Sequence, residues 1–472
     1  MPKLKPIKKE SFFDDTIAAI STAFGQAGIG IVRLSGHDAL SIADRIFISG
    51  EKKKPSQCQT YTIHYGWIAE GADKNRVIDE AILTIMRSPR SYTREDVVEI
   101  NCHSGIVPLR KIYELVLKCG ARPAEAGEFT RRAFVNGRID LVQAESVLDI
   151  IQSRTEASLE LGINQLQGRL SKKIEEIRSQ LLEIFAHLEA AIDFPEEDIK
   201  TAGRKKLLND LEKAALIINR ILDFATEGKI LREGISVVIY GKPNVGKSSL
   251  LNALLKEERA IVTHIPGTTK DTVEECANIA GIPLRLIDTA GIDRPKDLID
   301  EEAIKRSRQS MANADLILFV LDSSRGIDQQ DKEVFRQIAN KNVIVVVNKI
   351  DLKRGMNSAT LNQLAAKRKV ARVSALKDTG IRGLEKIISE TVFQGKIKPA
   401  EDILISNLRH INLLRLAQRA IQKTQGAFKE KLSVEFVSQE LKEALLSLDK
   451  ITGRAISEDL LDKIFSEFCI GK

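Results

Sequence analysis

One glycine-rich stretch has the residue types and spacing to bind phosphate. Residues 241–248 read Gly-Lys-Pro-Asn-Val-Gly-Lys-Ser, the G-x-x-x-x-G-K-[ST] pattern of a phosphate-binding loop. Its glycines let the backbone approach phosphate oxygens and turn N–H groups toward them. Lys247 can reach the β- and γ-phosphates, and the Ser248 hydroxyl can ligate Mg²⁺. A glycine turn that matches the pattern by chance is the alternative interpretation.

Two later segments predict that the bound base is guanine. Asn348-Lys349-Ile350-Asp351 follows the apolar run 343–347, and the Asp351 carboxylate can accept both N–H groups of guanine. Adenine presents a different edge, so this signature favours GTP over ATP. Ser374-Ala375-Leu376 follows another short strand-like run and resembles the loop that contacts guanine O6 through a backbone amide.

Two segments between these motifs are expected to contact the γ-phosphate end of the nucleotide. In Asp288-Thr289-Ala290-Gly291 the Asp can hold the Mg²⁺ shell through water, and the Gly amide can meet the γ-phosphate. Gly267-Thr268-Thr269-Lys270-Asp271 offers Thr269 as a second hydroxyl ligand for Mg²⁺, ordered only when the γ-phosphate is present. The order and spacing of all these segments predict a GTPase.

The elements that must position these motifs follow from the flanking residues. The β-branched run 235–240 predicts a strand before the phosphate-binding loop, and residues 249–255 predict a helix after it, whose N-terminus favours anions. Residues 284–287 and 343–347 predict two more strands. We therefore expect an α/β GTPase domain at residues 233–393.

Upstream, residues 14–133 predict a smaller α/β domain. Strands are expected at 31–34, 60–68, 81–86 and 96–100, and helices at 37–47 and 107–118. Three glycines precede the first of these strands, and their spacing is not a dinucleotide fingerprint, so we interpret them as turn residues rather than as a phosphate site. They are Gly25, Gly28 and Gly30.

The remaining segments, 134–232 and 394–472, predict helices on both sides of the GTPase domain. Apolar residues recur at three- and four-residue steps from Ile174 to Ala191, which gives one apolar stripe. Further helices are expected at 209–225, 410–423, 434–451 and 457–468. The predicted fold class is therefore multidomain α/β plus all-α, with the GTPase domain inserted into a helical domain whose two parts pack together.

Composition sets limits on the class of protein. The 472 residues, 43% of them hydrophobic, allow about three domains. A net charge of +7 permits a nucleic-acid partner, although a solvated basic surface has the same composition. Five cysteines without paired metal spacing fit a reducing compartment. No apolar run reaches spanning length and no signal-like stretch begins the chain, so we expect a cytoplasmic protein without membrane association and a disordered basic tail at 1–13.

The motifs in this setting resemble the MnmE (TrmE) family of tRNA-modifying GTPases, and the resemblance extends over nearly the whole chain. Its most diagnostic short piece is the tail Phe468-Cys469-Ile470-Gly471-Lys472, which matches a C-x-G-K terminus. Further matching stretches lie at residues 15–18, 28–36, 91–96, 127–134 and 193–195. The family fold implied is a folate-binding-like N-terminal dimerisation domain, a central helical bundle and an inserted Ras-like P-loop GTPase domain.

The resemblance also implies a function. Family members form a homodimer and assemble with the FAD-dependent protein MnmG (GidA) as a heterotetramer. Together they add a carboxymethylaminomethyl-type group to carbon 5 of the wobble uridine of certain tRNAs, using 5,10-methylene-tetrahydrofolate (or its 5-formyl analogue). The folate contacts implied here are Arg33, Glu99, Arg138 and Lys472. Folate carries carboxylates and pterin amides that suit such residues, although the sequence alone would make each a surface charge.

Cys469 lies in the matching tail. A lone cysteine near a chain end is usually inert. Beside Gly471 and Lys472 it could be a nucleophile, or it could help to shape the folate site, and the sequence leaves its chemistry open.

Hydrolysis in the family depends on K⁺, and this sequence departs from the family pattern at the group that orients water. Ile292 stands where Ras-like GTPases use Gln, and Ile cannot orient water. The family uses a Glu in the switch region, and the equivalent position is Asp300, followed by Glu301. Either carboxylate could take the role, and both could instead be helix N-terminal acids.

The complete set of expected site residues follows. The nucleotide and its cations are expected to contact Asn244, Val245, Gly246, Lys247, Ser248, Ser249, Thr263, His264, Ile265, Pro266, Gly267, Thr268, Thr269, Asp288, Thr289, Ala290, Gly291, Asn348, Lys349, Asp351, Ser374, Ala375 and Leu376. Within that set Mg²⁺ is expected at Ser248 and Thr269, and the resemblance implies K⁺ at Asn244, Thr263, Ile265 and Thr268. The catalytic roles are assigned to Asp300, Glu301, Lys247, Thr269 and Cys469.

Two other functions compete with tRNA modification. One is a regulatory GTPase of ribosome assembly, which would need neither folate contacts nor the C-x-G-K tail. The other is a structural dimer that binds GTP without hydrolysing it. Folate binding distinguishes the first alternative, and phosphate release in K⁺ against Na⁺ distinguishes the second.

Overall fold

The computed structural model describes residues 14–50, 53–71, 76–193, 201–256, 274–288, 311–366, 368–393 and 404–472. The expected tail at 1–13 lies outside these residues. Contacts divide the chain into two compact units, which are described separately. Unit 1 comprises residues 1–148, 165–211 and 419–472, and unit 2 comprises residues 149–164 and 212–418.

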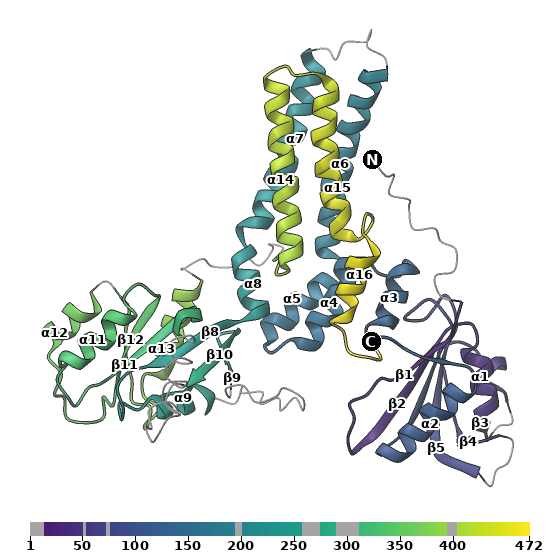
Figure 1. Ribbon diagram of the computed structural model, residues 1–472, viewed down its shortest axis with the longest axis horizontal. Coiled ribbons are helices and arrows are strands. Elements are labelled where there is room, and N and C mark those ends of the chain that lie inside the picture. The colour runs from purple at the N-terminus through teal and green to yellow at the C-terminus, as the bar shows by residue number, and fades with distance from the viewer. Residues whose placement is uncertain are drawn as a thin grey trace. The chain divides into compact units, whose positions relative to one another are not determined.

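Unit 1 contains a seven-stranded sheet, seen at the purple end of the chain in Figure 1. Its strands are β1 (Ile17–Ile20), β2 (Ala27–Ser35), β3 (Phe47–Ser49), β4 (Thr62–Ala69), β5 (Val77–Met86), β6 (Val97–Ser104) and β7 (Arg122–Pro123), in the order β3-β4-β5-β6-β2-β1-β7. All neighbours are antiparallel except β1 and β7. Residues alternate between the two faces, so Leu83, Ile85, Val98 and Ile100 are buried in one core. Helices α1 (Ala39–Ile46) and α2 (Ile106–Lys118) cover that core.

The glycine interpretation made from the sequence is wrong for two of three residues. Gly28 and Gly30 lie inside β2, which begins at Ala27, and not in a turn before it. A Cβ on Gly30 would lie 2.8 Å from Leu109 Cδ1. Glycine at that position therefore lets α2 pack closely on the sheet.

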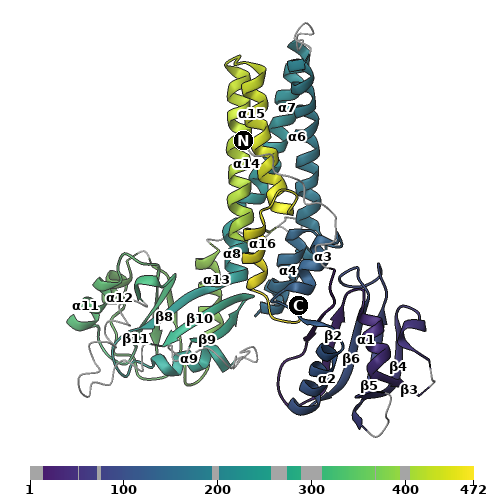
Figure 2. The same cartoon turned by 45° about the vertical axis from the view of Figure 1, so that its right-hand side comes forward.

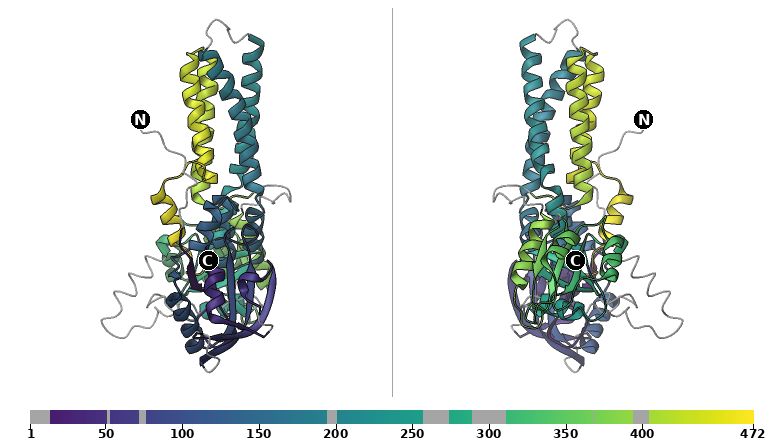
Figure 3. Two further views of the ribbon diagram at one scale, coloured as in Figure 1. Left: turned by 90° about the vertical axis from the view of Figure 1, so that its right-hand side faces the viewer. Right: turned by 90° about the vertical axis from the view of Figure 1, so that its left-hand side faces the viewer.

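Helices form the rest of unit 1. Helix α3 (Glu128–Val135) follows the sheet, and α6 (Arg169–Asp193), α15 (Val434–Thr452) and α16 (Glu458–Ser466) come from both sides of the predicted insertion. The side chains of the predicted stripe from Ile174 to Leu188 are buried in α6. Helix α15 lies beside α6, as the turned views in Figure 2 and Figure 3 also show, and Arg178 Nε donates to Asp449 Oδ1 at 2.6 Å. The prediction that the two helical parts pack together is confirmed.

Unit 2 contains a six-stranded sheet that is parallel except for one edge strand. Its strands are β8 (Ile235–Tyr240), β9 (Glu274–Ile279), β10 (Ile282–Asp288), β11 (Leu316–Asp322), β12 (Val343–Asn348) and β13 (Val370–Arg372), in the order β13-β12-β11-β8-β10-β9. Strand β9 is antiparallel to β10. The near-continuous apolar runs of β11 and β12 are buried on both faces, as expected for central parallel strands.

Helices cover both faces of this sheet. Helices α9 (Lys247–Lys256) and α13 (Ile381–Val392) pack on one face, and α11 (Gln329–Gln337) and α12 (Ser358–Ala365) pack on the other. Successive residues of β11 point to opposite faces of the sheet. Leu318 therefore packs in the core under α9 and α13, and Phe319 packs in the core under α11 and α12. Four helices cross or border the unit boundary: α4 (Leu141–Gln152), α5 (Glu156–Leu166), α7 (Thr201–Asp223) and α14 (Leu408–Lys429). Helix α8 (Ala225–Glu233) precedes β8.

The predicted domain boundaries stay predictions. Two of them fall inside helices, because α3 continues from residue 133 to Val135 and α8 continues from residue 232 to Glu233. Within the described residues no helix combines the length and apolarity needed to cross a bilayer.

Candidate functional site

The phosphate-binding loop lies between β8 and α9, in the predicted strand–loop–helix setting. Two of its glycines are required by close contacts. A Cβ on Gly241 would lie 2.5 Å from the Val320 carbonyl oxygen, and a Cβ on Gly246 would lie 2.4 Å from Asn348 Nδ2. Gly246 also has a φ of +93°, which side chains rarely adopt. The loop can therefore turn its backbone toward a ligand only with glycine at both positions.

Lys247 is the first residue of α9, and its side chain reaches back to the start of this loop. Its side chain is buried, and its ammonium donates to the carbonyl oxygens of Gly241 at 2.9 Å and Lys242 at 3.1 Å. Val245 is buried and anchors the loop, whereas Ser248 is exposed at the first turn of α9. A cation and a hydroxyl at a helix N-terminus suit a phosphate with its Mg²⁺.

Asn348 connects the phosphate-binding loop to the 374–376 loop. Its Nδ2 donates to the Val245 carbonyl at 3.0 Å, and its Oδ1 accepts from the amide of Ala375 at 3.0 Å. The next residue, Lys349, donates to the Asn244 carbonyl at 2.6 Å and to Asp322 at 2.7 Å. These bonds bring three motifs into one site, although Val245 lies 103 positions before Asn348 and Ala375 lies 27 positions after it.

Asp351 lies on the same side of the site. Its Oδ1 accepts from the Ser374 hydroxyl at 2.6 Å. That hydrogen bond holds the pKa of Asp351 below its usual value, so the half-buried carboxylate is ionised at neutral pH. An ionised carboxylate beside a backbone-amide loop can accept the two N–H groups of guanine while the amide meets its oxygen.

The remaining predicted nucleotide contacts are only partly described. Asp288 is the last residue of β10 and is paired in register with Ile239 of β8. The residues expected to respond to the γ-phosphate lie outside the described residues. They are Thr263, His264, Ile265, Pro266, Gly267, Thr268, Thr269, Thr289, Ala290, Gly291, Asp300 and Glu301.

In unit 1, the predicted folate residues Arg33 and Glu99 contact each other. They lie opposite one another on β2 and β6, and Arg33 Nε donates to Glu99 Oε1 at 2.7 Å. Another guanidinium N–H of Arg33 donates to the Gly471 carbonyl at 3.1 Å. The structure therefore brings the N-terminal sheet and the C-terminal tail together at Arg33.

Backbone contacts hold the tail in place. The amide of Phe129 donates to the Lys472 carbonyl at 3.2 Å, and the Ser21 hydroxyl donates to the Gly471 carbonyl at 3.2 Å. Ile470 forms an antiparallel bridge with Ala126. The side chain of Cys469 is exposed.

Arg138 lies beside Tyr92, which sequence reasoning did not select. The Arg138 guanidinium lies 4.8 Å from the centre of the Tyr92 ring, and the Tyr92 hydroxyl bonds Thr130 at 2.9 Å. Burial raises the pKa of Tyr92, and the positive charges of Arg138 and Arg33 oppose that rise. Both arginines therefore act on one aromatic ring. The signal that could have found Tyr92 is its place within the family stretch 91–96.

A buried charge network supports this tail site. Arg132 is fully buried and donates to Asp15 Oδ1 at 2.6 Å, Glu128 Oε1 at 2.9 Å and Glu95 Oε2 at 3.1 Å. Burial alone would raise the pKa of Asp15, but hydrogen bonds from Arg122 and Arg132 outweigh it and hold this pKa below its usual value. No local pattern predicted the network, because its members come from four separate segments.

Among the residues that the structure covers, no group of three His, Cys, Asp or Glu side chains could hold a metal ion. The strand–loop–helix with its buried lysine, joined through Asn348 to the loop beside Asp351, defines a P-loop protein of the guanine-nucleotide-binding class.

Comparison with known families is consistent with this class. Residues 16–138 match the model of the GTP-binding protein TrmE N-terminus, and residues 141–469 match that of the MnmE helical domain. Proteins named tRNA modification GTPase MnmE from Alkaliphilus oremlandii and Clostridioides difficile are each 46% identical over 461 residues, covering 98% of this chain and 100% of theirs. The chain belongs to the MnmE family.

One solved structure with sequence similarity is a variant of Era from Aquifex aeolicus bound to GDP and tetrafluoroaluminate. It is 33% identical and covers 39% of this chain and 66% of its own, with a TM-score of 0.28. A score this low carries no argument about the fold.

Proposed function

We propose that this GTP hydrolase uses its nucleotide cycle to modify tRNA, adding a carboxymethylaminomethyl-type group to carbon 5 of certain wobble uridines together with a FAD-dependent MnmG partner. One observation supports the proposal above others: the C-terminal tail is bound against Arg33 in unit 1, in a chain that also carries a guanine-nucleotide site. A GTPase that only switches between conformations needs no such tail site. In this role the protein works in the cytoplasm, where tRNA is found.

The described residues fit a guanine nucleotide with Mg²⁺. Gly241 and Gly246, which leave no room for a side chain, and the buried Lys247 can bind the phosphates. The Asp351 carboxylate can bind the base. Ser248 would hold Mg²⁺, with Thr269 as its partner when the γ-phosphate is present. Lys247 neutralises charge on the phosphates and so stabilises the transition state of γ-phosphate loss.

K⁺ would be held by Asn244, Thr263, Ile265 and Thr268, and of these only Asn244 is described. Its φ is +64° and its carbonyl oxygen accepts from Lys349, so the loop conformation at this residue is fixed. A bound K⁺ supplies positive charge beside the phosphates. Asp300 or Glu301 orients the attacking water in the proposal, because Ile292 cannot.

Folate would contact Arg33, Glu99, Arg138 and Lys472. Arg33 and Glu99 supply an adjacent cation and carboxylate, which suits a molecule that carries both carboxylates and hydrogen-bonding pterin amides. Cys469 is exposed two residues from the Gly471 carbonyl that Arg33 holds. Two roles remain proposed for Cys469: a nucleophile, or a residue that shapes the site.

An exposed aromatic face on the N-terminal sheet supports the proposed homodimer. Ile63, Tyr65 and Trp67 alternate along β4 with exposed fractions of 70%, 58% and 36%, and Ile82 of β5 lies directly opposite Tyr65. Apolar residues gathered on one face of a sheet commonly mark a protein–protein interface. In the proposal, two such faces meet, and MnmG completes a heterotetramer.

Phosphate release by the purified protein in K⁺ against Na⁺ tests the GTPase part. We expect hydrolysis of GTP but not ATP, and a rate at least about ten-fold higher in K⁺. Asp300→Ala and Glu301→Ala are then compared, and we expect at least one to lose most of this stimulation with little change in GDP affinity. Equal rates in both cations would contradict the K⁺ role.

Mass analysis of wobble nucleosides from a strain lacking the protein tests the modification. We expect the carbon-5 group to be absent and to return with the wild-type chain. Binding of 5-formyl-tetrahydrofolate to the full chain, lost in Arg33→Met, distinguishes this function from a regulatory GTPase of ribosome assembly. No folate binding together with unchanged nucleosides would favour that alternative.

A further inference from the structure

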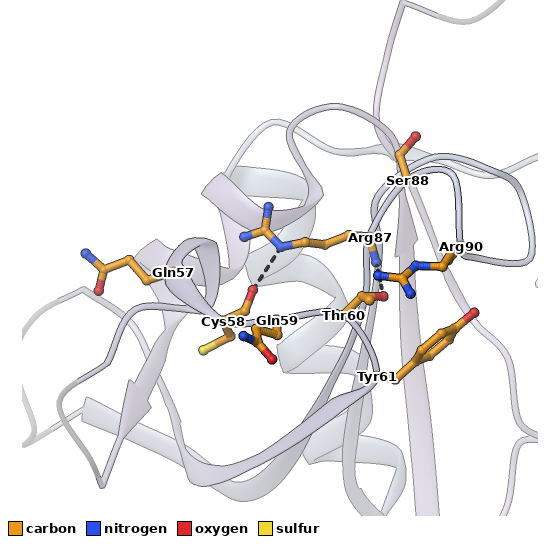
Figure 4. A pocket seen from close by; sticks show the side chains of 8 residues that line it. All are labelled: Gln57, Cys58, Gln59, Thr60, Tyr61, Arg87, Ser88 and Arg90. Atoms are coloured by element: carbon orange, nitrogen blue, oxygen red, sulfur yellow. Dashed lines mark hydrogen bonds between the residues drawn. The ribbon is translucent and has the colours of Figure 1, made fainter.

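A polar pocket in unit 1 contains none of the residues assigned above. It lies between the turn that precedes β4 and the loop that follows β5, and it encloses about 730 Å³ (Figure 4). The side chains that line it are Gln57, Cys58, Gln59, Thr60, Tyr61, Arg87, Ser88 and Arg90.

The charge of this pocket is positive. Arg87 and Arg90 line it, and no acidic residue does. Two acids bond to backbone amides without lining the pocket: Asp44 accepts from the Ser56 amide at 2.8 Å, and Asp96 accepts from the amide of Ser88, a lining residue, at 2.9 Å. Within the part of the chain that the structure describes, neither arginine forms an ion pair. The pocket is therefore suited to an anion.

Arg87 is fixed in position before any ligand arrives. Its Nε donates to the Cys58 carbonyl at 2.8 Å, and a second guanidinium N–H donates to the Ser56 carbonyl. Its own amide donates to Thr60 Oγ1 at 2.9 Å, as Figure 4 also shows. A guanidinium has five N–H groups, so donors remain after these bonds. A fixed donor loses little conformational entropy when it binds an anion.

Tyr61 adds an exposed aromatic face to the pocket. Its φ is +60°, a backbone conformation rare for an aromatic residue, and its amide donates to the Ile85 carbonyl at 2.7 Å. The side chain is 64% exposed, and the Arg90 guanidinium lies 6.0 Å from the ring centre. Residues in such strained backbone conformations cluster at active sites and ligand-binding sites. Here the ring is held outward and beside a cation.

We infer that this pocket binds one nucleotide of a single-stranded RNA segment, with its base on the Tyr61 ring and its phosphate at Arg87 and Arg90. Stacking on an aromatic ring beside arginine is a common way in which proteins hold unpaired nucleotides. A free nucleotide has the same chemistry as one nucleotide of an RNA. However, the exposed Lys53 and Lys54 extend the positive charge along the adjoining loop, where further phosphates of an RNA chain would lie. The inference rests on the proposed function, in which RNA is the substrate.

Binding of a fluorescein-labelled seven-nucleotide oligouridylate to the full chain, followed by anisotropy, tests the inference. Tyr61→Gly removes the ring and suits the positive φ, and we expect binding at least about five-fold weaker. Arg90→Gln should weaken binding similarly and lower the slope of log K against log salt by about 0.7. Tyr61→Phe keeps the ring and should bind as the wild type does.

Arg45→Gln is the matched control, because Arg45 is an exposed arginine of α1 that does not line the pocket. We expect less than a two-fold change in this variant. Unchanged binding in both Tyr61→Gly and Arg90→Gln would overturn the inference, as would uridine monophosphate binding as tightly as the oligonucleotide. GTP hydrolysis is measured on the same samples. Its absence in the wild type would count against the proposed function. An unchanged hydrolysis rate in the variants would assign any loss of RNA binding to the pocket.

Discussion

Lys242 occupies the second position of the phosphate-binding loop, and its side chain leaves the loop for helix α11. Its ammonium lies 2.5 Å from Asp328 Oδ2 and 3.2 Å from Asp331 Oδ2. Its carbonyl oxygen, in turn, accepts from the ammonium of Lys247. The ion pair therefore fixes the backbone on which the nucleotide-binding lysine rests.

We expect Lys242→Met to weaken GDP binding about two- to five-fold, because an ion pair of this exposure contributes at most about 1 kcal/mol. Titration with a fluorescent GDP analogue measures the change. Arg336→Met removes the same charge from an exposed position of α11 and should have no effect. If Lys242→Met binds GDP as tightly as the wild type, the ion pair does not position the loop.

Arg132 of α3 is fully buried and pairs with three carboxylates. Replacing it by Met would leave Asp15, Glu95 and Glu128 without their shared cation. Removing one partner of a buried ionic cluster costs about 3–5 kcal/mol of unfolding free energy. Urea unfolding at pH 7 measures this loss. Arg131→Met is the neighbouring control, and its pair with the exposed Asp462 predicts a loss of about 1 kcal/mol or less.

The Arg132 effect should also depend on pH. Burial alone would raise the pKa values of Asp15 and Glu128, but hydrogen bonds from Arg122, and then from Arg132, lower both overall. A carboxylate with a lowered folded pKa stabilises the fold above its unfolded pKa of about 4, and the stabilisation is lost as pH falls through the folded pKa. The difference between wild type and Arg132→Met should therefore be largest near neutral pH and shrink below about pH 4. A constant difference from pH 7 to pH 3 would mean that the carboxylates do not contribute.

Among the elements of unit 1, the C-terminal tail is held by one isolated bridge, between Ile470 and Ala126, and by hydrogen bonds to its backbone. Its Gly471 has a φ of +95°, and a Cβ there would lie 2.8 Å from the Ile20 carbonyl oxygen. Only glycine allows the tail to pass this close to the end of β1. The Arg33 and Ser21 bonds to the Gly471 carbonyl depend on that approach.

We expect Gly471→Ala to release the tail and to weaken 5-formyl-tetrahydrofolate binding at least about ten-fold, since both the close contact and the positive φ oppose alanine. Hydrogen exchange at the Phe129 amide, which donates to Lys472, reports the release directly. GTP hydrolysis by unit 2 should keep its wild-type rate. Ile470→Ala changes a side chain that is 64% exposed and should leave the Phe129 amide protected. Unchanged exchange in Gly471→Ala would show that the tail tolerates a Cβ there.

At the scale of the whole molecule, the lone tryptophan reports the proposed dimer. Trp67 lies on the exposed face of β4, 36% exposed, beside Tyr65 at 6.1 Å between ring centres. Burial between two copies would remove water from its ring. Dilution from micromolar to nanomolar concentration should therefore shift its emission to longer wavelength as the dimer dissociates.

Ile63→Glu places a charge in the same face and should give a monomer at micromolar concentration, as judged by sedimentation. The control is Leu216→Glu, a residue of α7 with a similar exposed fraction of 61%, which should stay dimeric. A dimeric Ile63→Glu variant would place the dimer interface elsewhere. A monomeric wild type would exclude the proposed dimer.

The features that depend on neighbouring residues could be predicted from the amino-acid order. The phosphate-binding loop, its flanking strand and helix, and the apolar stripe of α6 follow from local spacing, because glycine freedom and hydrophobic periodicity act within one or two turns of chain. Gly28 and Gly30 show the limit of that reasoning. They were predicted to be turn residues, but both lie in β2, which pairs with β6, and only Gly30 faces Leu109 of α2.

Only the tertiary structure decided which distant residues meet. Asn348 bonds Val245 across 103 positions, Arg33 bonds Gly471 across 438, and Tyr61 stands beside Arg90 because two strands pair in one register. No local pattern in the amino-acid order predicts these contacts, because they depend on how buried apolar surfaces pack against one another. Sequence therefore predicts the parts of each site, and packing brings those parts together.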